Sequence, residues 1–247
     1  MESFWEWFRA LNDARGINLT IFYDAFDRSR FVSGLLTTIQ LASIAVVASV
    51  LIGVVGAWLQ GSRLRLTRKL VYWYIQFFRN TPPLVQIYFF YFGIGSLLSA
   101  TGAAGQPVPM VSNVTWAVVS LSFFAGAFNV EIFRSGIEAV PGTTIEAAES
   151  LGFSRLHTYL LIVLPLAFRI CLPALNNNLV NLVKTTTLAY AIAVPELLYV
   201  SSQIWSDNLN VPEMMNVLLV MYFLLVGSLV WLMHRWERAI WVPGFGS

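Results

Sequence analysis

Charged side chains are scarce in this sequence. Of its 247 residues, 11% are Asp, Glu, Lys or Arg and 57% are hydrophobic, and the mean hydropathy is +0.67. A soluble globule of this size needs more charge to cover its surface, so the composition predicts a multi-spanning membrane protein. The formal net charge is only +2, which gives no basis for a nucleic-acid partner.

The residues and motifs of several site types are also missing. The single cysteine, Cys171, excludes an internal disulfide and a cysteine-based zinc site. The two histidines, His157 and His234, have no carboxylate or cysteine at ligand spacing, so no metal site is predicted. No Gly-x-x-x-x-Gly-Lys-Ser/Thr loop occurs, and no acid, base or metal residues cluster at one depth. The chain is therefore expected to bind no cofactor and to be no enzyme itself.

What the sequence has is long apolar segments. At about 1.5 Å per residue, some 20 residues cross a hydrocarbon core of about 30 Å. Two prolines within Arg79–Pro83 must bend or break the second segment. Gly53 and Gly56 lie on nearly one face of the first and predict close helix packing there. The five predicted spans are Leu35–Leu59, Val71–Leu98, Val114–Phe133, Ala167 to about Val200, and Met214–Met233.

The arginines predict the orientation of these spans. The densest positive cluster lies between the first two spans and the chain closes with further arginines, which marks both places as cytoplasmic. We therefore expect an all-α membrane protein with five transmembrane helices, the N-terminus outside and the C-terminus inside. Residues 1–32 are expected to form an N-terminal interfacial segment and 33–247 one membrane domain with a cytoplasmic loop at 135–165. The cytoplasmic residues are Arg63, Arg65, Arg68, Lys69, Arg235 and Arg238.

A polar island lies in that loop. Thr143 is predicted to cap a helix that starts at about Thr144, with Glu146 reaching back to the cap. Ala147 and Ala148 add helix propensity with little bulk, so another protein's backbone can approach closely. Gly152 then permits a bend that other residues resist. The pattern predicts two short helices with a bend between them.

This stretch also carries a resemblance. Glu146-Ala147-Ala148, three residues, Gly152, nine residues and Ile162–Pro165 resemble the EAA signature of membrane subunits of binding-protein-dependent ABC importers. The resemblance implies that Glu146, Ala147, Ala148 and Gly152 contact a cytoplasmic ATPase. The alternative is an amphipathic helix that lies on the bilayer through Ile145, Ala148, Leu151 and Leu156.

Three further motifs resemble one branch of that family, which imports polar amino acids of the glutamate/aspartate, histidine and glutamine types. They are Thr37–Ile39, Arg79–Gln86 and Tyr91–Gly93, and with the EAA stretch they cover roughly Thr37 to Pro195. Glu131 and Arg134 resemble a recurrent pair in the family. Because a charge buried alone in a membrane is costly, an Arg79–Glu131 ion pair is also predicted, with a structural role favoured over substrate binding.

The fourth span is rich in polar side chains. Asn177, Asn181 and Thr185 fall on one helical face with Lys184, and Asn178 lies beside them, so these residues could line a substrate path. Interhelical hydrogen bonding is an equally good explanation for the asparagines. Lys184 must find a carboxylate, a helix C-terminus or water, and is assigned a structural or gating role. Importers of cationic amino acids are implied to have acidic residues near Asn178 and Thr185, so neutral residues here favour acidic or neutral polar cargo.

The residues and the resemblance together predict a permease subunit in the bacterial inner membrane that imports polar amino acids by alternating access. Its expected partners are two ATPase subunits that hold ATP and Mg, a second permease (the same chain or a paralogue), an external substrate-binding protein, the amino acid and the bilayer. The alternatives are an ion-gradient-driven secondary transporter or channel, a membrane enzyme and a non-transporting receptor subunit. The sequence leaves open which amino acid is carried, whether the second permease is identical, and whether this subunit has its own substrate site.

Overall fold

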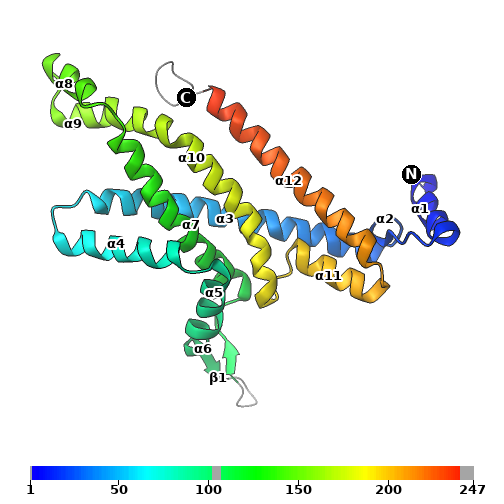
Figure 1. The fold of residues 1–247 in the computed structure, drawn as a ribbon. Coiled ribbons are helices and arrows are strands. Elements are labelled where there is room, and N and C mark those ends of the chain that lie inside the picture. The colour runs from blue at the N-terminus through cyan, green and yellow to red at the C-terminus, as the bar shows by residue number, and fades with distance from the viewer. Residues whose placement is uncertain (1, 102–106, 240–247) are drawn as a thin grey trace. The chain divides into compact units, whose positions relative to one another are not determined.

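A computed structural model describes residues 2–101 and 107–239, most of them helical (Figure 1). The chain divides into two compact units whose segments alternate along the sequence. Unit 1 comprises Met1–Ile44, Leu84–Ser120 and Lys184–Gly227. Unit 2 comprises Ala45–Pro83, Leu121–Val183 and Ser228–Ser247.

Among the described residues, four helical stretches are long and apolar enough to cross a membrane. They are α3 (Ala25–Gln60), α7 (Asn113–Glu138), the stretch Arg155–Ile192 and α12 (Val211–Ala239). The stretch Arg155–Ile192 consists of α9 (Arg155–Thr158), the π-helical η2 (Tyr159–Val163), α10 (Leu164–Thr185) and the 3-10 helix η3 (Thr186–Ile192). Each of these four stretches overlaps one predicted span.

The second predicted span is broken, as its two prolines require. The helix α4 (Arg65–Asn80) ends before Thr81, whose extended backbone (φ −111°, ψ 143°) is the conformation that a following proline favours. A new helical run then starts at Pro83 with α5 (Pro83–Tyr88), the π-helical η1 (Phe89–Ile94) and α6 (Gly95–Leu97). This run, Pro83–Leu97, is apolar but shorter than the four long stretches.

The prediction of an all-α chain was wrong in one short stretch. Strand β1 (Ser99–Thr101) pairs antiparallel with β2 (Pro107–Pro109), with Ala100 opposite Val108. Both strands lie in the segment predicted as an outer loop, and residues 102–106 of that loop lie outside the described residues. The residues around them are too rich in glycine and proline to continue a helix, which leaves extended backbone free to pair.

Unit 1 has an apolar core built from distant parts of the sequence. It contains α1 (Glu2–Arg15), α2 (Thr20–Tyr23) and α11 (Leu197–Asn208) as well as the parts of the long helices within its bounds. Ile21 and Phe31 pack there with Leu197, Ile204 and Met214. Residues of the segment predicted as interfacial, 1–32, thus share a core with residues beyond 196.

Unit 2 brings α3 and α7 into very close contact. A Cβ atom added at Gly53 would lie 2.4 Å from Asn129 Cβ, and one at Gly56 would lie 2.3 Å from Val130 Cγ2. The prediction that these glycines mark close helix packing is confirmed. Because α7 continues to Glu138, this contact fixes the helix that leads into α8 (Gly142–Ser150).

Candidate functional site

The loop predicted to contact an ATPase forms two short helices, α8 and α9, beyond the end of α7 (Figure 1). The predicted helix start was wrong by two residues. Helix α8 begins at Gly142, with Pro141 as the N-cap residue in an extended conformation and no side-chain cap hydrogen bond. Proline suits this position, because a helix start leaves its first backbone N–H groups unpaired and Pro141 has none to lose.

The predicted bend at Gly152 is confirmed. Gly152 has φ +86°, a left-handed conformation that favours glycine. Its N–H donates to Glu149 O at 3.0 Å, and the N–H of Phe153 donates to Ala148 O at 3.2 Å. These two bonds are the Schellman arrangement that closes a helix at a glycine. The sequence therefore fixes the end of α8 through backbone geometry alone.

An apolar cluster of unit 2 anchors α8 to the long helices. Val140, Val163 and Ala167 are buried together, and Ile137 and Ile145 pack against them. These side chains come from the end of α7, from α8, from η2 and from the start of α10. Gly136 brings α7 and α10 even closer, since an added Cβ there would lie 2.7 Å from Ala167 O. Helix α8 is thus packed against residues of α7 and α10.

The outer side of this segment is uncovered within the described chain. Glu146, Ala147 and Gly152 are exposed, whereas Ala148 is only 4% exposed. Exposed apolar side chains lie next to them, with Leu151 at 80% and Leu156 at 65% exposure. Of the predicted contact residues, Ala148 therefore faces the protein interior and the other three face outward. An exposed patch of apolar side chains flanked by acids is typical of a protein interaction surface.

The alternative orientation, with this helix lying on the bilayer, would need its apolar residues on one outward face. Ile145 is half-buried and Ala148 is buried, while Leu151 and Leu156 are exposed. The apolar residues are thus divided between an inward and an outward side. Glu146 and Glu149 share the exposed side with Leu151, an arrangement that suits a protein partner better than lipid.

Arg79 and Glu131 form the predicted ion pair within unit 2. Arg79 Nη1 lies 3.4 Å from Glu131 Oε2, and the guanidinium also lies over the ring of Phe128 at 5.2 Å. Glu131 Oε1 is 3.9 Å from Arg134 Nη1, and Arg134 Nε is 3.0 Å from Glu138 Oε1. Charges therefore alternate from the last turn of α4 along α7 toward α8. The 134–138 link was not predicted, although its i,i+4 spacing is a readable signal.

The predicted substrate-path residues on α10 do not share one environment. Asn177 and Asn181 are exposed, and Lys184 is exposed in the last turn of α10, where a helix C-terminus favours a cation. Thr185 is half-buried and is the last residue of α10. The row of side chains expected at helical spacing therefore stops here, because the chain continues as the 3-10 helix η3.

Asn178 is instead bound to α7. Its Nδ2 donates to Asn129 Oδ1 at 2.8 Å and to Ala125 O at 3.1 Å. Asn129 is fully buried and donates in turn to Ser49 Oγ of α3 at 3.2 Å. This chain of amides links three helices of unit 2 and matches the interhelical alternative for Asn178.

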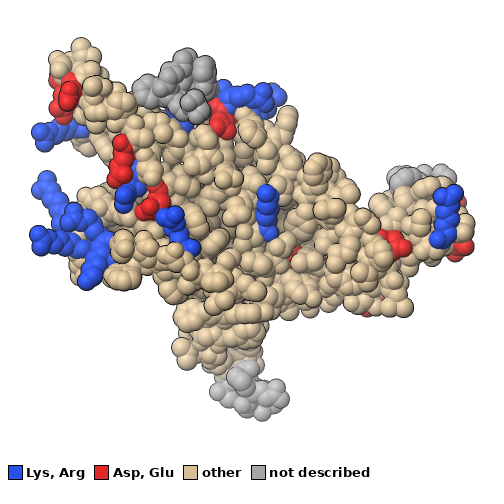
Figure 2. Space-filling view, viewed as in Figure 1, with Lys and Arg blue, Asp and Glu red and all other residues tan. Residues whose placement is uncertain are grey.

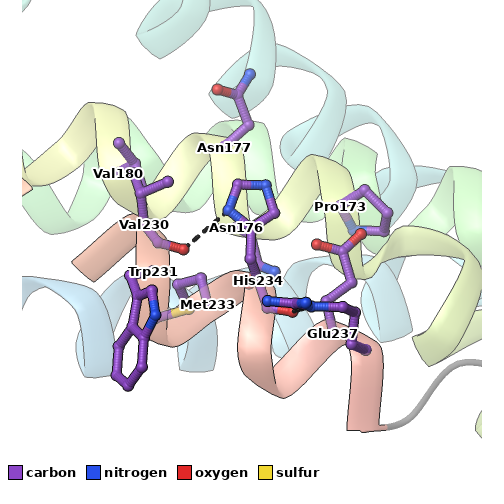
Figure 3. A pocket seen from close by; sticks show the side chains of 10 residues that line it. Pro173, Asn176, Asn177, Val180, Val230, Trp231, Met233, His234 and Glu237 are labelled. Atoms are coloured by element: carbon purple, nitrogen blue, oxygen red, sulfur yellow. Dashed lines mark hydrogen bonds between the residues drawn. The ribbon is translucent and has the colours of Figure 1, made fainter. Parts of the chain in front are cut away.

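A groove between α10 and α12 is lined by Asn176, which was not among the predicted site residues. The groove has a volume of about 730 Å³ and is lined by Asn176, Asn177 and His234 among others. Figure 3 shows the imidazole of His234 pointing from α12 toward α10, with its Nδ1 3.0 Å from Val230 O. The side-chain amide of Asn176 is buried and has no hydrogen-bond partner among the described residues. Helical spacing groups Asn177 with Asn181 and gave no signal for Asn176.

Comparison with known proteins identifies the relatives of this chain. Residues 49–242 match the family described as "Binding-protein-dependent transport system inner membrane component". The chain is 32% identical over 212 residues to the histidine/lysine/arginine/ornithine transport system permease protein HisM of Salmonella typhimurium, covering 86% of this chain and 90% of HisM. It is 28% identical over 212 residues to the probable amino-acid permease protein YxeN of Bacillus subtilis, covering 86% and 92%.

A further relative is the nopaline transport system permease protein NocM of Agrobacterium fabrum, 30% identical over 203 residues, with 81% of this chain and 84% of NocM covered. Among solved structures, a crystal structure of an amino acid ABC transporter with histidines matches with a TM-score of 0.76 at 28% identity, over 86% of this chain and 94% of that one. An inward-facing MetNI methionine ABC transporter matches in fold, with a TM-score of 0.67 at 19% identity, over 86% and 96%.

Proposed function

Since the chain belongs to the family of binding-protein-dependent transport system inner membrane components, we propose that it is a permease subunit through which an ATP-driven importer moves amino acids. The family consists of multi-pass inner-membrane subunits of ABC importers whose partner subunits hydrolyse ATP. The sequence has no nucleotide-binding loop of its own. ATP and Mg are therefore assigned to the partners.

One observation carries the proposal. The segment that ends at Gly152 presents Glu146, Ala147 and the 80%-exposed Leu151 outward, while Ile145 packs with residues of α7 and α10 and Ala148 is buried. A surface that is open on one side and fixed to membrane helices on the other is suited to receive a force. An ATPase that grips it would move α7 and α10.

The mechanism follows from that anchoring. Closure of the ATPases on ATP moves the α8 segments, and the attached membrane helices change between inward-open and outward-open arrangements. The ligand-loaded binding protein favours the outward-open arrangement, so amino acid enters the cavity from outside. Hydrolysis and product release restore the inward-open arrangement. This chain contributes the membrane passage for the amino acid and the α8 segment that the ATPase moves.

We propose five spans, with the N-terminus outside and the C-terminus inside. Four stretches have the length and composition of membrane helices, and the apolar run Pro83–Leu97 supplies the fifth. A short run is sufficient where neighbouring protein replaces lipid, as the break at Thr81–Pro83 suggests. The cluster from Arg63 to Lys69 then lies on the cytoplasmic side, which is the side of an ATPase.

The complex is proposed to hold two ATPases, two permeases and an external binding protein. The last membrane helix, α12, supports a second permease. Only 6% of the most apolar 18-residue stretch of α12 is buried within this chain. Leu219 and Phe223 of this helix are 69% and 75% exposed. The second copy is either the same chain or a paralogue.

The cargo is proposed at the level of amino acids. The expected preference for acidic or neutral polar cargo is not supported, because the relatives include a histidine/lysine/arginine/ornithine permease at 32% identity. The physical argument is weaker as well. That argument depended on the neutral side chain of Asn178. This side chain donates its amide hydrogens to α7. The remaining candidates for a path are the exposed Asn177 and Asn181 together with Thr185.

Transport by the reconstituted complex tests this function. Proteoliposomes containing the permease, its ATPases and its binding protein should accumulate amino acid only with internal ATP. Uptake by the permease alone under a proton or sodium gradient, without ATP, would favour the ion-gradient-driven transporter instead. The amino acid that most stimulates the ATPase activity of the complete complex would identify the cargo.

A further inference from the structure

A second groove of unit 2 lies where membrane helices end. It has a volume of about 930 Å³ and is lined by residues of the end of α3, the start of α4, the end of α7 and the first residue of η2. The candidate membrane stretches end at Gln60 and Glu138 and begin at Arg155. Three stretches thus terminate around one groove. Where membrane-spanning helices end, hydrocarbon gives way to lipid headgroups.

The lining of this groove carries a net positive charge. Its charged residues are Arg68, Arg134 and Glu138. Glu138 Oε1 is 3.0 Å from Arg134 Nε, so this carboxylate offsets one of the two positive charges of the lining. Within residues 2–101 and 107–239, Arg68 makes no ion pair. Its guanidinium has five N–H donors in a planar fork, a geometry that matches the oxygens of a phosphate.

Aromatic and aliphatic side chains surround these arginines. Trp58, Tyr72 and Tyr159 line the groove, and Trp58 and Tyr72 are 75% and 53% exposed. Amphipathic rings of this kind are enriched at the level of lipid headgroups. Leu59 and Ile137 also line the groove. Apolar side chains exposed beside unpaired arginine suit a ligand with a phosphate and acyl chains.

Four basic side chains gather at the start of α4 (Figure 2). Figure 2 shows Lys and Arg gathered where α4 begins, the end that Figure 1 marks by the turn between α3 and α4. The cluster contains Arg63, Arg65, Arg68 and Lys69. Only Arg68 of these four lines the groove. The other three provide a general attraction for anionic lipid, whereas Arg68 is placed to hold one molecule.

We infer that this groove binds one anionic phospholipid of the inner leaflet, with its phosphate on Arg68 and Arg134 and its acyl chains along Trp58, Leu59 and Tyr72. Arg68 belongs to α4 and Arg134 to α7, so the bound phosphate joins these two helices. Arg134 is also linked to Glu131 and through it to Arg79. The lipid therefore contacts the same series of ion pairs that runs along α7 toward α8.

Lipid retention by the purified complete complex tests the inference. The complex is placed in nanodiscs of phosphatidylcholine with phosphatidylglycerol, extracted into mild detergent, and its bound lipids are counted by native mass spectrometry. Wild type is expected to keep phosphatidylglycerol in preference to phosphatidylcholine. Because one arginine near a membrane surface is worth about 1 kcal/mol, Arg68→Gln should lower this retention about five-fold. Glu138→Gln should raise it, since it removes the carboxylate from the lining.

The matched control is Arg65→Gln, one turn earlier on α4 and outside the groove. It should leave retention near wild type. Equal losses in the two arginine variants would show a diffuse surface attraction and overturn the inference, as would unchanged retention in Arg68→Gln. Loss of the ATPase from Arg68→Gln with lipid retained would make the groove a protein contact.

A competition arm separates the lipid from other sources of phosphate. Millimolar inorganic phosphate or glycerol phosphate is added to the detergent-solubilised complex before the lipids are counted. Retained phosphatidylglycerol supports a lipid site, because acyl-chain contacts add to the phosphate contact. Displacement by either soluble ion would overturn the lipid assignment in favour of a free phosphate site. The result does not depend on transport, so it is separate from the proposed function.

Discussion

The α8 segment and helix α10 carry the two sets of predicted functional residues. The two sets differ in how far their side chains are used in contacts within the protein. Glu146 of α8 and Gly152, which follows α8, are exposed, and a Cβ added at Gly152 would meet no atom within 4 Å. In α10, the amide of Asn178 is bound to Asn129 and to Ala125. The first set remains available to a partner, whereas the second is partly used to hold the bundle together.

The largest effect is expected from Gly152→Asp. At φ +86° a residue with a Cβ costs about 1–2 kcal/mol, so the Schellman end of α8 opens and the exposed surface is lost. We expect ATP-driven uptake to fall at least about ten-fold while membrane insertion stays normal. Proteoliposome uptake and the amount of inserted protein measure the two effects.

The control is Gly142→Asp. Gly142 is at the other end of α8, has ordinary backbone angles, and has open space around an added Cβ, as does Gly152. It adds the same charge without the strain, and a first-turn acid suits a helix start. Uptake near wild type in both variants would break the contrast between α8 and α10.

The next largest effect concerns the ion pairs that join α4 to α7. Arg79→Glu puts two carboxylates beside each other, and Glu131→Arg puts Arg79, Arg134 and the new arginine together. Each single variant should lose most uptake, and the double exchange should restore a substantial part of it. Additive damage in the double variant would mean that the 3.4 Å contact has no role in transport.

Substitutions at Ala147 and Ala148 distinguish an effect on ATPase binding from an effect on protein stability. Ala147 is exposed, so Ala147→Phe should weaken binding of the ATPase without lowering the thermal stability of the permease. Ala148 is 4% exposed, so Ala148→Phe overpacks its site and should destabilise the protein by about 1–3 kcal/mol. Co-purification of the ATPase and a thermal melt distinguish them. The same melting temperature for both variants would contradict the assigned orientation of α8.

The smallest effect is expected in α10. Asn178→Asp removes the donor that reaches Asn129 Oδ1 and Ala125 O and should cost about 1–2 kcal/mol of stability. Asn177→Asp, on the exposed side, should leave stability unchanged. A change toward cationic cargo in Asn178→Asp at full stability would instead make Asn178 a substrate-path residue.

The contrast also explains what the sequence could predict. The bend at Gly152, the break at Pro82 and the close packing at Gly53 depend on backbone rules that one or two residues set, and all three are present. The prediction of an N-cap at Thr143 was wrong because Pro141 starts the helix earlier. The partners of Asn178 lie about 50 residues away in the sequence, and no local pattern tells which neighbour a polar side chain will meet in the folded bundle.

The central claim is that an ATPase grips α8. The chain has one cysteine, the buried Cys171, so the single substitution Cys171→Ala gives a cysteine-free background. In that background Ala147→Cys is paired with single cysteines on the ATPase surface in the complete transporter. The account predicts a disulfide cross-link to the ATPase that blocks ATP-driven uptake and is reversed by reductant. An active complex in which Ala147→Cys forms no cross-link, or forms one that leaves uptake unchanged, would contradict it.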